Sequence, residues 1–77
     1  MHRSDLHESV INSICIYIND RPYVVVNSYY NQNNDDFMYE LYDVTKKEPI
    51  GVELDTLVIL DREGTLEVIT KPETQKE

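Results

Sequence analysis

The sequence predicts a mostly β domain: five short antiparallel strands in a small, partly open barrel or bent sheet, with a short N-terminal helix. The apolar residues are rich in Ile, Val, Leu and Tyr, which favour pleated, half-buried surfaces. Alanine, the strongest helix former, does not occur. Stretches with strand period are separated at short intervals by turn residues. A chain of 77 residues leaves room for one such domain.

The first 13 residues differ from the rest and are expected to form an N-terminal helix. Ser4 can cap a helix over about residues 4–12, and Asp5 follows in the first turn, where the helix dipole favours acids. Apolar side chains recur near helical spacing in this stretch. An extended arm over residues 1–13 is the alternative.

Residues 14–70 are expected to form the β-domain, and residues 71–77 a polar C-terminal tail. Between the first two strands lies Asn-Asp-Arg-Pro at 19–22, whose residues favour turn conformations. A loop without apolar residues follows the second strand at 31–36. The expected strands cover residues 14–18, 23–30, 37–44, 50–60 and 66–70.

The fourth of these strands has two interpretations. Alternation places Glu53 and Asp55 on the same outward side, two residues apart, but every residue of 57–60 is apolar. We therefore expect one long strand or two strands joined at a bend, where burial changes from one-sided to two-sided. Residues 61–64 would then close a hairpin, with Gly64 supplying the positive φ that its loop needs.

The order of these features is similar to that of SH3-like barrels. A Tyr-Val-Val strand, a polar loop, an aromatic-rich strand, a turn, an apolar strand and a tight hairpin follow one another over residues 14–70. The resemblance implies a fold type and no family, because it rests on strand rhythm. The peptide-binding SH3 signature includes a tryptophan, which this chain lacks. A flat antiparallel sheet with the helix packed on one face is the second interpretation.

No residues with the pattern of a catalytic, cofactor or metal site stand out. Cys15 lies in an Ile-rich strand, where a free cysteine is typically a small buried hydrophobe, while His2 and His7 lie near the N-terminus. Two glycines cannot build a phosphate-cradling loop. Asp35 and Asp36 follow two asparagines and could hold Ca²⁺ weakly, but they lack the spacing and glycine of a calcium loop. We expect a protein that is not an enzyme.

Charge and tyrosines carry the functional prediction. The net charge is −8, and residues 35–67 hold ten acids and three bases, so we expect the acids to gather on the outer side of the sheet. The six tyrosines are too many for so small a core, and exposed tyrosine is frequent at protein interfaces. Acids that merely keep the domain soluble are the alternative reading. The residues expected to carry a contact on the outer sheet surface are Tyr30, Glu40, Tyr42, Glu53, Asp55 and Glu67.

The sequence therefore predicts a small cytoplasmic protein-binding module, an adaptor or an inhibitor, whose partner has a basic surface. Neither direct nucleic-acid binding nor membrane insertion is expected. A nucleic-acid mimic that blocks a DNA- or RNA-binding protein is the alternative. Its size and charge are similar in outline to those of phage-encoded host-takeover or anti-defence proteins. A structural subunit that self-assembles through its edge strands, and hence a homo-oligomer, is the second alternative.

Overall fold

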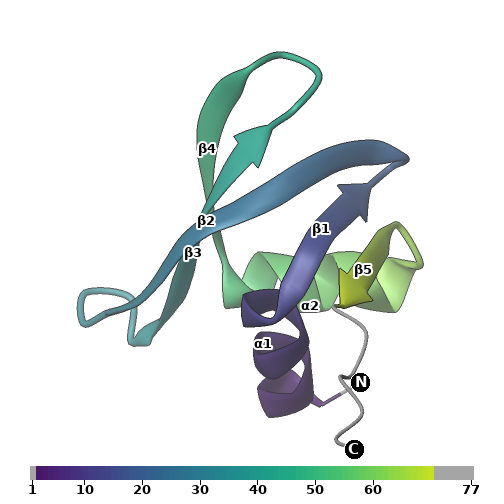
Figure 1. Ribbon diagram of the computed structural model, residues 1–77. Helices are drawn as coiled ribbons and strands as arrows, with labels where there is room; N and C mark the ends of the chain where they lie inside the picture. Colours follow the sequence, from purple (N-terminus) through teal and green to yellow (C-terminus); the bar gives the residue numbers. More distant parts are fainter. Residues whose placement is uncertain (1, 71–77) are drawn as a thin grey trace, which may run out of the picture.

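The computed structural model describes residues 2–70 and contains two helices and five strands in that range (Figure 1). Neither described helix is long and apolar enough to cross a bilayer. The elements in chain order are α1 (Arg3–Ile11), β1 (Ser13–Ile18), β2 (Arg21–Asn31), β3 (Asp36–Asp43), β4 (Glu48–Glu53), α2 (Leu54–Glu63) and β5 (Leu66–Thr70).

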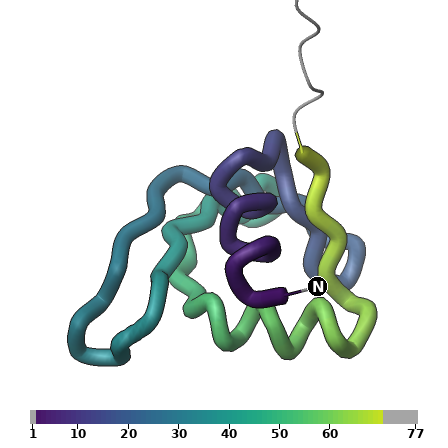
Figure 2. The backbone as a smooth tube through the Cα atoms, turned by 90° about the horizontal axis from the view of Figure 1, so that it is seen from below, coloured from purple at the N-terminus to yellow at the C-terminus, as the bar shows by residue number. Residues whose placement is uncertain are grey.

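All five strands pair antiparallel in one open sheet with the order β4-β3-β2-β1-β5. This confirms the predicted mostly β fold, and it is consistent with the small open barrel or bent sheet expected for it. The sheet is not closed between its edge strands β4 and β5. Figure 2 shows α2 running along one side of the sheet, with α1 beside it.

The first hairpin lies where the sequence predicts it, but its turn is shorter than the predicted 19–22, because Arg21 and Pro22 belong to β2. Ile18 pairs with Arg21, so that Asn19 and Asp20 alone form the loop. Both have positive φ, at 53° and 66°. Two left-handed residues in a two-residue loop match the right-handed twist of the flanking strands, and Asn and Asp tolerate that conformation better than other side chains.

The prediction of a strand over residues 50–60 is wrong beyond Glu53, where β4 ends and α2 begins. Leu54 and Leu57 are both buried at helical spacing. Gly64 has a φ of 79° and ends the helix instead of closing a hairpin. Its N–H donates to the carbonyl of Asp61 at 3.1 Å, as in a helix that stops at a left-handed glycine.

The N-terminal segment is a helix, as the first interpretation predicts, and not an arm. It begins at Arg3, with His2 as its N-cap, so Ser4 does not have the capping role expected of it. The predicted polar tail at 71–77 lies outside the described residues.

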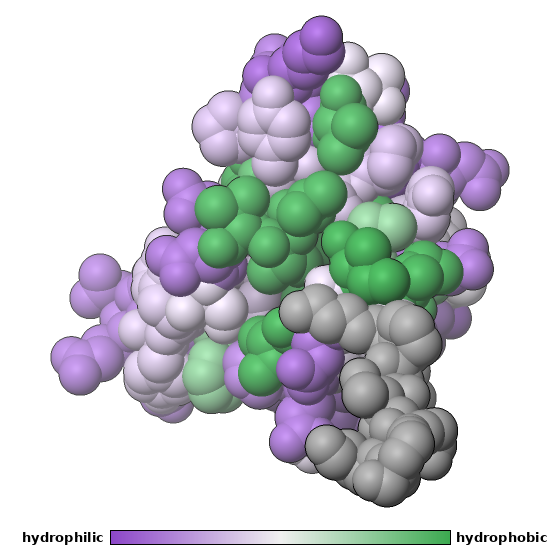
Figure 3. Space-filling view, viewed as in Figure 1, coloured by the Kyte–Doolittle hydropathy of each residue, from purple (hydrophilic) through white to green (hydrophobic). Residues whose placement is uncertain are grey.

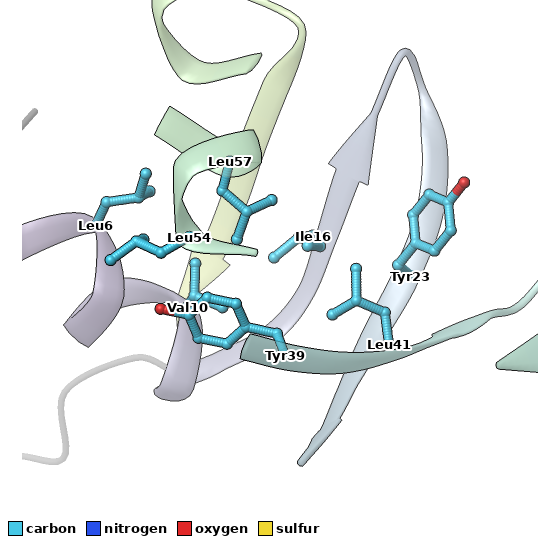
Figure 4. Close-up of a cluster of buried hydrophobic side chains, with 8 residues drawn as sticks. All are labelled: Leu6, Val10, Ile16, Tyr23, Tyr39, Leu41, Leu54 and Leu57. Atoms are coloured by element: carbon cyan, nitrogen blue, oxygen red, sulfur yellow. The ribbon is translucent and has the colours of Figure 1, made fainter. Parts of the chain in front are cut away.

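The core lies between the sheet and the two helices. Each helix contributes two buried side chains, and β1, β2 and β3 contribute the others. Figure 4 shows these side chains, with those of the helices facing Ile16 and Tyr39, and with Tyr23 at the margin on the side of Leu41. The eight residues of the cluster are Leu6, Val10, Ile16, Tyr23, Tyr39, Leu41, Leu54 and Leu57. One face of the sheet is thereby covered, and we call the opposite face the open face.

Candidate functional site: the open face of the sheet

The pairing register determines which side chains share the open face. Tyr39 and Leu41 of β3 are buried in the core, so the alternate residues of β3 point the other way. Their partners on β2 and β4 point the same way and form three rows across the sheet. The rows are Val24–Tyr42–Pro49, Asn27–Glu40–Gly51 and Tyr29–Met38–Glu53.

A cluster of exposed apolar side chains lies on this face, and we call it the apolar patch: Val24, Val26, Tyr29 and Tyr42. Their relative exposures lie between 37% and 62%, with Val26 the highest. Val26 is the extra residue of a bulge, because Val25 pairs with Leu41 while Asn27 pairs with Glu40. Figure 3 looks onto this face and shows apolar side chains across its middle, with hydrophilic ones around them.

A hollow of about 320 Å³ adjoins the patch above Gly51. Tyr29, Glu40 and Pro49 line it from the open face, together with Tyr39 and Ile50. The hollow exists because the row that contains Glu40 ends in a glycine. A Cβ built on Gly51 would meet no atom within 4 Å.

Three carboxylates converge where β4 ends and α2 begins, and we call them the acidic corner: Asp36, Glu53 and Asp55. One oxygen of each lies within 4.8 Å of those of the other two. Arg3 of α1 forms ion pairs with both Asp36 and Asp55. Asn34 donates to Glu53 Oε2 at 2.8 Å. The guanidinium of Arg3 therefore neutralises part of the negative charge of the acidic corner.

Asp36 holds the corner together from a buried position. Its Oδ1 accepts from the Phe37 amide at 2.9 Å and from Arg3, and its Oδ2 accepts from the Asp55 amide at 3.2 Å. Burial pushes the pKa of Asp36 upward, but these donors outweigh burial and hold that pKa below its ordinary value. Because Glu53 makes no side-chain cap, Asp36 satisfies a free N–H at the start of α2 from a different strand.

An aromatic group lies beside the corner, on the helix-covered side of the sheet. His7 stacks on Phe37 with ring centroids 4.1 Å apart, and its Nδ1 lies 2.5 Å from the hydroxyl of Tyr39. Burial, together with the negative charge of Asp36, raises the pKa of Tyr39 to about 12. These contacts join α1 to β3, so we assign them a structural role.

Three of the six predicted contact residues lie on the open face within regular strands. Glu40 and Tyr42 are adjacent outward positions of β3, and both are exposed. Glu67 of β5 is exposed and pairs with Tyr17, whose neighbours on β1 point into the core. Glu53 has the parity of the open face, but it is partly buried and contacts Asn34.

The other two predicted residues lie elsewhere. Asp55 belongs to α2 and not to a strand, so it does not share a face with Glu53 as predicted. Strict alternation from Tyr23 would turn Tyr30 outward, but the bulge at Val26 reverses the parity of the residues after it. Tyr30 therefore pairs with Phe37 on the helix side, and Tyr29 takes the outward place.

The expected gathering of acids on one side is also wrong. Asp36 and Asp43 are buried. Asp55, Asp61 and Glu63 are residues of α2, which covers the opposite face. The prediction from sequence did not include the apolar patch or the hollow above Gly51. The run of three valines at 24–26 indicates apolar surface on this strand, but nothing in the sequence indicates the bulge that exposes Val26.

Comparison with protein-family models, with curated proteins and with solved structures finds no match to this chain.

Proposed function

We propose that this protein is a non-enzymatic protein-binding module that uses its open face as the contact surface. The observation that carries the proposal is the apolar patch on a sheet face that neither described helix covers. Exposed apolar side chains gathered in one place and bordered by polar ones are typical of interaction sites. Two of the four patch residues are tyrosines, which are enriched among the residues that dominate binding energy.

The charge of the chain supports a partner with a basic surface. Glu40 lies in the row between those of Tyr42 and Tyr29, and Glu67 lies on the same face on β5. With a net charge of −8, the module would repel acidic surfaces and attract basic ones. The partner we propose is a protein surface with an apolar centre and Lys or Arg at its margin. Charged margins speed association and set specificity, while the apolar centre supplies affinity.

This surface favours a protein partner over nucleic-acid mimicry. A mimic of nucleic acid needs closely spaced carboxylates, because DNA carries one charge per about 1.7 Å of its axis. The open face carries the apolar patch, and two of the three carboxylates of the acidic corner, those of Asp36 and Asp55, are paired with Arg3. Displacement of a bound partner by added DNA would favour the mimic.

The experiment is a selection of peptides and protein fragments from a display library on the immobilised chain. Ligands are then retested against Val26→Asp, which places a charge in the apolar patch. Ile59→Asp is the matched control, since Ile59 is also exposed, at 51%, but lies on α2. Both changes are at exposed positions, and thermal unfolding would confirm that both variants fold.

Ligands that lose binding with Val26→Asp and keep it with Ile59→Asp support the proposal. Their binding should also weaken as salt is raised, because exposed charges at the margin are screened. Selected ligands that bind both variants as well as the unmodified chain would contradict the proposal. So would a selection that enriches no ligand at all.

A further inference from the structure

We infer that the hollow above Gly51 anchors an arginine side chain of the partner. This inference rests on the proposed function, because it assigns a specific part of the partner to a specific part of the open face. The hollow has a volume of about 320 Å³, at the lower end of the range of about 300–1,000 Å³ for ligand pockets. It suits one long side chain better than a larger ligand.

The walls of the hollow match the two parts of an arginine side chain. The ring of Tyr29 and the ring of Pro49 are apolar surfaces, and both residues have outward parity in the sheet. An arginine stem can lie along such surfaces while its guanidinium stacks on an aromatic ring. Tyr29 is half exposed, so its ring is open to such a contact.

Glu40 provides the charge. It is exposed, lies between Asn27 and Gly51 in its row, and has no hydrogen bond or ion pair to another side chain within residues 2–70. A carboxylate and a guanidinium can form two parallel hydrogen bonds, which a lysine ammonium cannot reproduce. Glu53 is two residues along β4 from Gly51, about 7 Å away at strand spacing, and adds to the negative field.

The acidic corner is a weaker candidate for the same side chain. Its carboxylates already contact Arg3 and Asn34, so an incoming cation would have to displace contacts within the chain. Glu40 requires no such displacement. Because the carboxylates of the acidic corner already have partners and that of Glu40 is available, we place the arginine anchor above Gly51.

Gly51 also allows a direct test, because its substitution fills the hollow without disturbing the fold. A new Cβ meets nothing within 4 Å, and the residue has no positive φ. Valine is a better strand former than glycine, so Gly51→Val should unfold at an equal or higher temperature. Its branched side chain would occupy the space next to Glu40.

The experiment is an NMR titration of the full chain with acetyl-Gly-Arg-Gly-amide. The control peptide carries citrulline, which has nearly the shape of arginine without its charge. We expect the arginine peptide to shift the amide signals of Tyr29, Glu40 and Gly51, with a Kd in the millimolar range. Citrulline should bind at least about tenfold more weakly, since it loses a charged hydrogen-bonding pair.

Two variants and one control complete the test. Gly51→Val and Glu40→Gln should each weaken binding of the arginine peptide by at least about tenfold, the equivalent of one such contact. Glu63→Gln removes an exposed carboxylate on α2, which covers the opposite face, and should leave binding unchanged. Equal binding of the citrulline peptide, unchanged binding to Gly51→Val, or shifts centred on the acidic corner would overturn the inference.

Failure of this inference is distinguishable from failure of the proposed function. Library ligands that require Val26 but tolerate Gly51→Val would support the open face as a contact surface and refute the arginine anchor. Arginine binding above Gly51, with no ligand that depends on Val26, would refute the proposed function and support a cation-binding hollow alone.

Discussion

Asp36→Asn tests whether one buried carboxylate joins α1, β3 and α2. The asparagine has nearly the shape of aspartate, but it offers one acceptor oxygen where the carboxylate offers two. Asp36 uses both oxygens, for the amide of Phe37 and Arg3 on one side and for the amide of Asp55 on the other. In the variant, an NH₂ group must face one of these donors, so at least one hydrogen bond is lost.

The size of the effect follows from these contacts. A hydrogen bond to a charged group contributes about 1.5–3 kcal/mol to stability. The bond to Arg3 is worth less than this, because the arginine is half exposed and screened by water. We expect the free energy of unfolding to fall by about 2 kcal/mol. For a domain of this size, such a loss lowers Tm by about 8–16 °C.

The assay is urea and thermal unfolding, followed by circular dichroism over a range of pH. Because the folded state lowers the pKa of Asp36, its contribution is present above the ordinary value of 3.8 and is lost as pH falls through the lower folded value. The difference between the two proteins should therefore be full at pH 7 and vanish in strong acid.

Asp35→Asn is the matched control for this change. Asp35 is the exposed neighbour of Asp36, and its carboxylate contacts the hydroxyl of Tyr30. We expect it to change stability by less than about 0.5 kcal/mol. An equal loss in both variants, or no loss with Asp36→Asn at pH 7, would refute the role of Asp36 as the joint between the three elements.

Three further predictions probe the fold. Leu57→Ala should cost about 3 kcal/mol in urea unfolding, because Leu57 is fully buried, whereas Ile59→Ala on the exposed side of α2 should cost less than about 0.5 kcal/mol. Gly64→Ala should cost about 1 kcal/mol in the same assay, because its φ is 79°, and Gly51→Ala should cost nothing. The raised pKa of Tyr39 predicts an ionisation step near pH 12 in the ultraviolet absorbance, absent in Tyr39→Phe, and stability that declines from about pH 10 through that step.

Local patterns predicted much of the sheet because local chemistry decides those elements. The alternation of Ile14, Ile16 and Ile18 and the Asn-Asp pair at 19–20 specify a strand and a tight turn without help from distant residues. The outward direction predicted for Tyr42 is also confirmed, since Tyr42 is exposed while Tyr39, which has the opposite parity on β3, is buried.

The helix α2 could not be decided in the same way. A short apolar run such as 57–60 is compatible with a buried strand or with a helix. The residues at its ends indicate a helix: Asp55 in the first turn, Arg62 in the last and Gly64 after it. The N-terminal hydrogen bond that favours the helix is donated by the Asp55 amide and accepted by Asp36, 19 residues earlier in the chain.

The candidate site shows the same division. The composition and parity of β3 predicted Glu40 and Tyr42 as outward residues. This prediction is confirmed because β3 pairs with β4 without a bulge, so its side chains alternate regularly. One bulge at Val26 exchanged the directions of Tyr29 and Tyr30 and thereby moved an aromatic ring onto the open face.

The sequence by itself determined the first three strands and the last one, the first hairpin and the acidic charge, because each depends on residues adjacent in the chain. Only the tertiary structure decided which sheet face the helices cover, which of Tyr29 and Tyr30 lies on the open face and where a glycine leaves a gap. Those outcomes depend on the register between strands and on a hydrogen bond from a distant carboxylate, and neither is encoded in any local pattern.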